Sequence, residues 1–318
     1  MGCMGNRDRR GATVRKLSGG LVLVLTTLGM GCGGGAQEFA PPVPEGRLEQ
    51  AALSHNQLST NGLSFNGLSF NGLSFNGLSQ SGLSQAAFAS WFSDNPARAD
   101  EVMRYIVRCA VPEGQTRTYL HAQTNKTYTW PGLLGLAPGW AGGATATVAE
   151  QQVVSACLVA HANPFGVSVP LSVQGRDALG QVLASSPEEL AEFSRPESCF
   201  FGNLFQNQGM YAGSQNPPLN ANQSTSRACA VVDGSGTPRR ACAPIVYVGS
   251  CAAACTLDAA TGVSFLRCKV GDVYFQPLTT RVRDADLAVC GDGRCQVTES
   301  CGTSNTYNAC AADCGACP

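Results

Sequence analysis

Sulfur dominates the side chains of this protein that could do chemistry. Its 318 residues include 16 cysteines but only three histidines. Zinc sites made of cysteine and histidine require both residue types in number, whereas an exported, oxidised protein accumulates cysteine alone. Downstream of Cys32 the number of cysteines is even, fourteen, which predicts complete pairing in disulfides. These disulfide candidates are Cys109, Cys157, Cys199, Cys229, Cys242, Cys251, Cys255, Cys268, Cys290, Cys295, Cys301, Cys310, Cys314 and Cys317.

Cys157 and His161 have the spacing of a thiolate and its base, or of two metal ligands, because residues four apart share one face of a helix. That face is also the apolar face of the expected helix. We therefore favour a buried half-cystine, with His161 at the helix end and Cys109 of a second helix as the partner of Cys157. A thiol in a disulfide cannot attack a substrate.

Familiar catalytic motifs are missing from the sequence. It contains no Gly-x-Ser-x-Gly elbow, phosphate-binding loop, His-Glu-x-x-His or dinucleotide fingerprint. Its 21 basic and 22 acidic residues nearly balance, which argues against a nucleic-acid partner. A hydrolase with scattered catalytic residues stays open as an alternative. In that case His121 or His161 would lie in a cleft beside a carboxylate or a hydroxyl.

The N-terminus has the organisation of an export signal. Cationic residues up to Lys16 precede an apolar run over residues 17–28, which is too short to span a membrane. The run ends in Leu28-Gly29-Met30-Gly31-Cys32, which resembles a bacterial lipobox. The resemblance implies a signal peptide over residues 1–31 and a lipid on Cys32. Ordinary cleavage near Ala36 is the alternative, and both interpretations place the protein outside the cytosol.

Two low-complexity segments follow. Residues 32–55 are rich in Gly and Pro and predict a flexible tether. Residues 56–85 form six five-residue units, each with a Leu followed by Ser, and Asn-Gly opens four of them. Asn-Gly favours tight turns, so the segment resembles pentapeptide-repeat β-helices. A partly ordered stalk is the alternative.

Residues 86–289 have an ordinary composition and are long enough for one hydrophobic core. Capping signals and apolar spacing predict helices over residues 96–109, 147–161 and from Ser186. Alternation predicts a strand over residues 167–173, and Pro170 marks it as an edge strand. Helices followed by strands indicate an α+β fold. The later strands are expected at residues 229–232, 243–248, 263–268 and 273–278.

Residues 290–318 hold six cysteines and are too few to bury a core, so cross-links must stabilise them. Cys290-Gly-Asp-Gly-Arg-Cys295, followed by Glu299 and Asp313-Cys314-Gly315, resembles the Cys-rich modules of bacterial surface proteins. Together with the lipobox and the Asn-Gly-Leu-Ser repeats, it makes the whole chain resemble a family of myxobacterial lipoproteins. The resemblance implies a place in the cell envelope, at the outer membrane or cell surface, and no particular activity.

Calcium is the one cofactor that the tail suggests. Asp292-Gly293 and Glu299 have the spacing of the second half of an EF-hand loop. The leading carboxylates are missing, so Asp313 or Asp286 would have to complete a weak site. Carboxylates that accept bonds from loop amides are the alternative. Zinc is disfavoured because only Cys314 and Cys317 have Cys-x-x-Cys spacing.

Exposed aromatic residues on loops can bind sugars, and Trp130, Trp140 and Tyr128 lie near Pro-Gly turns, although tryptophan more often packs in a core. Neighbouring glutamates at 188, 189 and 192 are more typical of a solvated helix face than of a glycosidase acid pair.

The sequence thus favours an exported envelope lipoprotein with a non-catalytic surface-interaction or structural role. Its expected partners are the membrane, through the lipid, and an envelope protein or glycan. The alternatives are a secreted hydrolase and a weak calcium or glycan binder.

Overall fold

The computed structural model describes residues 53–56, 58–59, 77–215, 218–227, 229–230, 232 and 242–318. The predicted signal peptide, Cys32, most of the tether and the middle of the repeat segment lie outside the described residues. No helix in the described part is long and apolar enough to cross a membrane.

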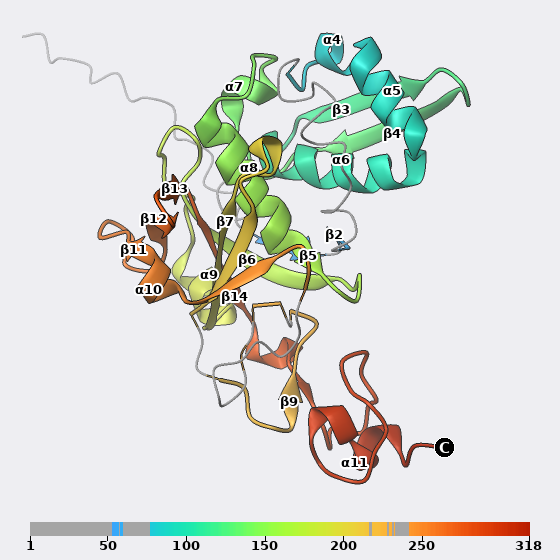
Figure 1. The fold of residues 1–318 in the computed structure, drawn as a ribbon, viewed down its shortest axis with the longest axis vertical. Coiled ribbons are helices and arrows are strands. Elements are labelled where there is room, and N and C mark those ends of the chain that lie inside the picture. The colour runs from blue at the N-terminus through green and yellow to red at the C-terminus, as the bar shows by residue number, and fades with distance from the viewer. Residues whose placement is uncertain are drawn as a thin grey trace, which may run out of the picture. The chain divides into compact units, whose positions relative to one another are not determined.

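A six-stranded sheet lies at the centre of the fold (Figure 1). Its neighbours pair antiparallel, except that β8 and β10 run parallel. In spatial order the strands are β1 (Leu53–Asn56), β6 (Val169–Gly175), β14 (Leu278–Val282), β7 (Arg195–Gly202), β8 (Met210–Ser214) and β10 (Val246–Ser250).

Both faces of this sheet are covered. Phe200 of β7 and Leu278 of β14 lie opposite each other and belong to the core that includes α8 (Val148–His161). Cys199 and Phe201 point to the other face because side chains alternate along a strand. There they join a second core with a three-stranded sheet. That sheet consists of β11 (Cys255–Leu257), β12 (Phe265–Val270) and β13 (Val273–Phe275), preceded by the short helix α10 (Cys251–Ala254).

Local signals in the sequence position the main helices. Asn95 accepts a bond from the Arg98 amide at the start of α6 (Pro96–Ala110), with Pro96 at the first helical position. Thr147 and Glu150 form the predicted capping box of α8. Both predicted helices are confirmed. Ser186 caps α9 (Pro187–Glu192) as expected. Two further helices are α5 (Ala86–Asp94) and the short α7 (Pro138–Ala141).

An aromatic cluster fills the space between α5 and a hairpin of β3 (Thr116–His121) and β4 (Lys126–Pro131). The ring of Phe92 lies 4.7 Å from that of Tyr128 and 4.8 Å from that of Tyr119, centroid to centroid. Such edge and tilted contacts add to the stability that burial already provides. The hairpin is therefore attached to the helices through its side chains.

The two ends of the repeat segment belong to the folded domain. β1 pairs with β6, and β2 (Leu58–Ser59) pairs with β5 (Ala162–Asn163). Leu78 and Leu83, at the helix α4 (Gln80–Leu83), are fully buried in the main core. The core thus begins eight residues before the expected boundary at 86, and the last residues of the expected tether form a strand. The solenoid and stalk interpretations cover residues 56–85, of which residue 57 and residues 60–76 lie outside the described part.

Three strand predictions need correction. β6 is the second strand of the sheet rather than an edge, although β14 pairs with it only from Ser172 onward. Pro170, which lacks an N–H, therefore has β1 as its neighbour on one side only. Cys229 and Ala230 lie in a turn and not in a strand. The strand expected over 273–278 is two strands, β13 and β14, which belong to different sheets.

A buried ion pair attaches the loop after β9 (Gln223–Ser224) to the sheet. Arg227 donates two bonds to Glu197, with N–O distances of 2.7 and 2.9 Å. Both side chains are almost completely buried. Arg227 also donates to the carbonyl oxygens of Ala160 and Ala162, where α8 ends. A cation there satisfies helix carbonyls that have no partner within the helix.

The Cys-rich tail contains little regular structure. Just before the tail, β15 (Ala288–Val289) pairs with β9, and within the tail the Tyr307 amide donates to the Ala221 carbonyl. Its helical elements are η4 (Tyr307–Ala309) and α11 (Ala311–Cys314). Two further short elements of the described residues are η2 (Leu204–Gln206) and η3 (Asp284–Asp286).

Candidate functional site: the three-stranded sheet and its clefts

All fourteen cysteines from Cys109 onward are paired. The helices α6 and α8 are joined through Cys109 and Cys157, the bond that their spacing favoured. The tail pairs its first cysteine with its fourth, its second with its fifth and its third with its sixth. The remaining bonds are Cys199–Cys251, Cys229–Cys242 and Cys255–Cys268. This connectivity leaves no thiolate nucleophile among these residues.

His161 has a structural position. Its Nδ1 lies 2.7 Å from the carbonyl oxygen of Cys157 and 3.5 Å from the Cys157 sulfur. Cys109, Cys157 and His161 approach closely enough to suggest metal ligation. However, both sulfurs are consumed by the disulfide and all three residues are buried. The arrangement is that of a half-cystine and a core histidine.

His121 has a hydroxyl on each side, which the sequence did not reveal. Its Nε2 lies 2.9 Å from the hydroxyl of Ser93, and its Nδ1 lies 2.8 Å from the hydroxyl of Thr124. The imidazole is 2% exposed and packs against Phe92. In the triad of serine hydrolases a carboxylate orients the base, whereas here a threonine has that position. Because Ser93 and His121 are 28 residues apart, no spacing signal connects them.

The aromatic residues proposed for glycan binding are core residues. Trp140 is fully buried, and Trp130 is 1% exposed and donates through Nε1 to Asp100. Tyr128 is also buried. The core position that the sequence favoured for tryptophan is confirmed, and these side chains do not form a glycan platform. Tyr128 and Trp130 pack against Phe92 of α5, and Trp140 packs against Phe205. The glutamate group is split as well, because Glu189 is buried and accepts a bond from Ser172.

The predicted calcium residues mainly accept hydrogen bonds from the tail itself. Asp313 accepts from the amides of Gly291 and Gly293, at 2.6 and 2.9 Å. Asp292 accepts from the Arg294 amide and the Gln296 side chain. One oxygen of Glu299 accepts from the Gln296 amide. The other, Oε1, is buried with no hydrogen-bond partner among the described residues.

The charges of the tail also act on Glu299. Burial raises the pKa of this carboxyl, and the nearby carboxylates of Asp313 and Asp292 raise it further. In the described part of the chain, the clusters whose potential metal-ligand atoms all lie within 4.8 Å of one another do not include Asp292, Glu299 and Asp313 together. These residues are neighbours, but their oxygens do not converge on one point.

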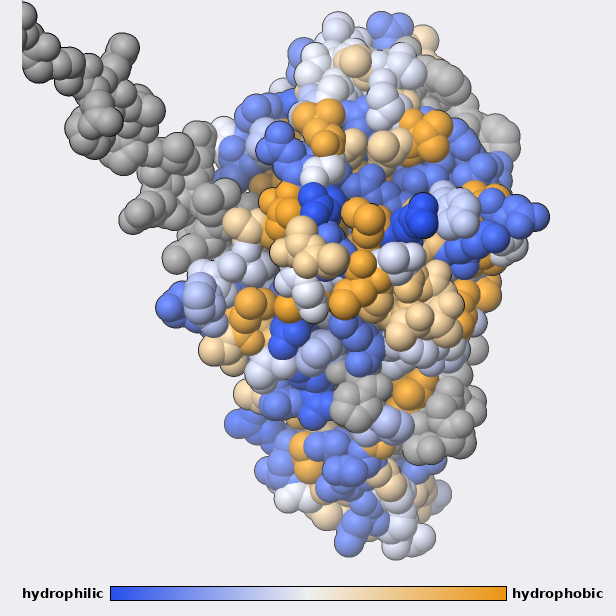
Figure 2. Space-filling view, turned by 90° about the vertical axis from the view of Figure 1, so that its left-hand side faces the viewer, coloured by the Kyte–Doolittle hydropathy of each residue, from blue (hydrophilic) through white to orange (hydrophobic). Residues whose placement is uncertain are grey.

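The side of the molecule that carries β11–β13 offers an extended surface. Figure 2 shows apolar groups there, interspersed with polar ones. Leu179 is 70% exposed and Tyr274 is 52% exposed. Together with Leu266 they line a shallow groove of about 450 Å³. Other exposed apolar residues of these strands and the adjoining loop include Val182, Leu257 and Val273.

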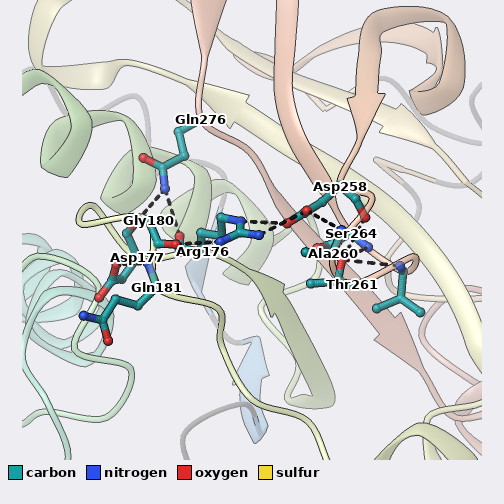
Figure 3. Close-up of polar contacts among 10 residues, drawn as sticks. Arg176, Asp177, Gly180, Gln181, Asp258, Ala260, Thr261, Ser264 and Gln276 are labelled. Atoms are coloured by element: carbon teal, nitrogen blue, oxygen red, sulfur yellow. Dashed lines mark hydrogen bonds and ion pairs between the residues drawn. The ribbon is translucent and has the colours of Figure 1, made fainter.

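A network of polar contacts fixes the rim of this groove (Figure 3). Arg176 donates two bonds to Asp258, with N–O distances of 2.7 and 3.1 Å. The bonds from Arg176 hold the pKa of Asp258 below its usual value. The Gln276 side chain donates to the carbonyl oxygens of Arg176 and Asp177. The loop after β6 is thereby attached to the three-stranded sheet.

The two edges of the three-stranded sheet differ. Gln152 of α8 donates to the Tyr274 carbonyl of β13 and accepts from the amide of Gln276, the residue after β13, which occupies backbone groups along this edge. On the opposite side β11 borders a cleft of about 670 Å³ that β10 also lines. Tyr247, Cys255 and Leu257 contribute to its wall. The cleft is thus bounded by an edge strand of each sheet, β10 of the six-stranded sheet and β11 of the three-stranded sheet.

No known protein family, curated protein or solved structure matches this chain.

Proposed function

We propose that this protein is an exported lipoprotein of the cell envelope. Its role is to bind a partner through its surface or to support structure, and not to catalyse a reaction. In this proposal one disulfide-rich α+β domain carries the repeat segment on its N-terminal side and the Cys-rich module on its C-terminal side. Lipid on Cys32 would anchor the protein at the outer membrane or cell surface. The groove beside Tyr274 offers a place for an envelope partner.

The observation that carries the proposal is the pairing of every cysteine from Cys109 to Cys317. Disulfides persist in exported proteins and are rare in the cytosol. His121 and His161 also support a non-catalytic role, because both are buried in packed surroundings. A surface with exposed Leu and Tyr side chains is a suitable interaction surface, since apolar groups stabilise contacts when they leave water.

The test uses the full-length protein expressed in a diderm bacterium. The intact mass should show a diacylglycerol-modified N-terminus at Cys32, and reduction should add fourteen hydrogens, two for each of the seven bonds. Cys32→Ser should move the protein from the membrane fraction to the soluble fraction. Cys3→Ser is the matched control and should change nothing. A cytoplasmic, fully reduced protein would refute the proposal.

A secreted hydrolase is a second candidate because of the contact between Ser93 and His121. A serine activated by histidine reacts with fluorophosphonate probes. If the pair is catalytic, the probe should label Ser93, and His121→Ala should abolish labelling. We expect no labelling, because Thr124 takes the place of the orienting carboxylate.

Calcium binding by Asp292, Glu299 and Asp313 is a third candidate, favoured by the unpartnered buried oxygen of Glu299. Calcium would supply the missing partner of that oxygen and would raise the melting temperature of the tail. Chelation should reverse the change, and Glu299→Gln should remove it. An equal response of the wild type and Glu299→Gln to calcium would exclude this site.

A further inference from the structure

Two disulfides meet behind the cleft between β10 and β11. Cys199–Cys251 joins β7 to α10, and Cys255–Cys268 joins β11 to β12. The sulfur of Cys255 lies 3.6 Å from the sulfur of Cys199, which is van der Waals contact. The sulfurs of Cys199, Cys255 and Cys268 all lie within 4.8 Å of one another. The two bonds therefore form a cluster and are not independent cross-links.

Access to this cluster is one-sided. Cys255 is partly exposed and lines the cleft of about 670 Å³. Cys199, Cys251 and Cys268 are buried. Disulfide exchange needs a thiolate to reach a disulfide sulfur. A small reagent in the cleft therefore meets the cluster at Cys255.

We propose that this cluster is a thiol–disulfide exchange site, which accepts a small dithiol in the cleft, rearranges its own bonds, and ends with Cys251 and Cys268 as the two reduced thiols. The proposal goes beyond the envelope function and does not depend on it. It assigns a chemical reactivity to cysteines that otherwise only stabilise the fold.

The first half of the reaction reduces the outer disulfide. One thiolate of the dithiol attacks the sulfur of Cys255, forms a mixed disulfide and expels the thiolate of Cys268. The second thiol of the reagent then attacks the reagent's first sulfur, which is the one bonded to Cys255 in the mixed disulfide. The reagent leaves as a cyclic disulfide, and Cys255 is released as a thiolate. The dithiol has lost two electrons and two protons.

The second half moves the reducing equivalents inward. The Cys255 thiolate attacks the neighbouring sulfur of Cys199, forms a Cys199–Cys255 bond and expels the thiolate of Cys251. The two protons end on Cys251 and Cys268. One of the two original disulfides is thus replaced and the other is reduced, which balances the oxidation of one dithiol. This step is intramolecular, and the sulfurs of Cys255 and Cys199 already lie 3.6 Å apart. We therefore expect it to be fast.

The exchange needs little rearrangement of the fold. Cys251 begins α10 and Cys255 directly follows it, so β7 stays bonded to the same short segment after the exchange. Cys199 faces Gly213 of β8, where a Cβ would lie 2.9 Å from the Cys199 sulfur and 3.1 Å from the Cys251 sulfur. The missing side chain leaves room for the sulfurs. The main consequence is that β12 loses its covalent link to β11.

The experiment treats the oxidised full-length protein with a limiting amount of dithiothreitol, followed by acid quenching and alkylation. Tandem mass spectrometry then maps the peptides, and fragmentation within Ala252–Ala254 separates Cys251 from Cys255. The expected product has alkylated Cys251 and Cys268 and a Cys199–Cys255 disulfide. Alkylated Cys255 and Cys268 with an intact Cys199–Cys251 bond would overturn the proposal.

An internal control lies in the same protein. Cys229 and Cys242 have the same sequence separation, 13 residues, as Cys255 and Cys268. Molecules in which this control bond is reduced should carry alkyl groups on Cys229 and Cys242 themselves. Exchange of partners there as well would show general scrambling and would also overturn the proposal.

A variant tests the key contact without any reductant. Cys251→Ser combined with Cys268→Ser leaves Cys199 and Cys255 without their partners. If the two sulfurs are poised to react, the purified variant should contain a Cys199–Cys255 disulfide. Two free thiols at these positions in a folded variant would contradict the inference. A variant that fails to fold leaves the mapping of the wild type as the deciding measurement.

Discussion

The main domain and the Cys-rich tail are stabilised by different means. The main domain has a large core that includes Trp130, Trp140 and Phe200. In residues 290–318 only Cys290, Glu299 and Cys310 are buried. The tail instead has three disulfides and carboxylates that bind its own amides. Disulfides therefore replace a core in the tail, whereas in the main domain they supplement one.

The largest expected effect is in the main domain, at the buried ion pair. Arg227→Ala leaves Glu197 buried without its partner, so the free energy of unfolding should fall by about 3–5 kcal/mol. Urea unfolding followed by tryptophan fluorescence measures this change. Arg104→Ala is the control, because Arg104 forms an exposed pair with Asp100 and should change stability by at most about 0.5 kcal/mol. Equal effects of both substitutions would contradict the prediction.

The next effect distinguishes the two regions through their disulfides. Cys290→Ser with Cys310→Ser should destabilise the tail by about 2–5 kcal/mol, because little burial remains to order it. Hydrogen exchange should show loss of protection in residues 290–318 alone. Cys109→Ala with Cys157→Ala should leave α6 and α8 protected, since packing holds them. Loss of protection in α8 together with retained protection in the tail would reverse the comparison.

A smaller effect concerns the carboxylate that organises the start of the tail. Asp313→Ala removes the acceptor of the Gly291 and Gly293 amides. The expected loss of local stability is about 1.5–3 kcal/mol, the range for hydrogen bonds to charged groups. Exchange of the Gly293 amide measures it. Asp272→Ala, at an exposed side chain of the main domain, is the control and should have no measurable effect.

The smallest effect is a difference in pH dependence. The pKa of Asp258 is lowered by Arg176, so its stabilising contribution is present above the ordinary Asp value, about 3.9, and is lost on acidification. The pKa of Glu299 is raised, so its contribution is present below the ordinary Glu value, about 4.3, and is lost as pH rises through the raised value.

Glu299→Gln should therefore raise the melting temperature of the tail at pH 7 and have no such effect near pH 4. Asp258→Asn should lower the melting temperature of the main domain at pH 7. Thermal unfolding monitored region by region by hydrogen exchange separates the two signals. A shift of the same sign at pH 7 for both variants would show that the two carboxyls are not in opposite environments.

Elements with local signals were predictable from the sequence. Asn95-Pro96 and the Thr147/Glu150 box fix the starts of α6 and α8 because caps act over only a few residues. The bond between Cys109 and Cys157 followed from the apolar faces of these helices. The other six pairings did not, because connectivity depends on contacts between strands that are distant in sequence.

The missed features have a common physical cause. The five-residue repeat suggested a separate segment, so the burial of Leu78 and Leu83 in the main core was not anticipated. The position of Trp130 depends on how the β3–β4 hairpin packs on α6, which no local pattern specifies. The groove beside Tyr274 and the sulfur contact between Cys199 and Cys255 likewise arise only when two sheets come together.

Gly213 gives a handle for finding relatives of this protein. A Cβ there would lie 2.9 Å from the sulfur of Cys199 and 3.1 Å from the sulfur of Cys251, which leaves little room for a larger residue beside this disulfide. We therefore expect a homologue that keeps the two cysteines to keep the glycine as well. A sequence search for the pattern of Cys199, Gly213 and Cys251, with any number of residues allowed between them, would therefore use a packing constraint of the interior to find relatives.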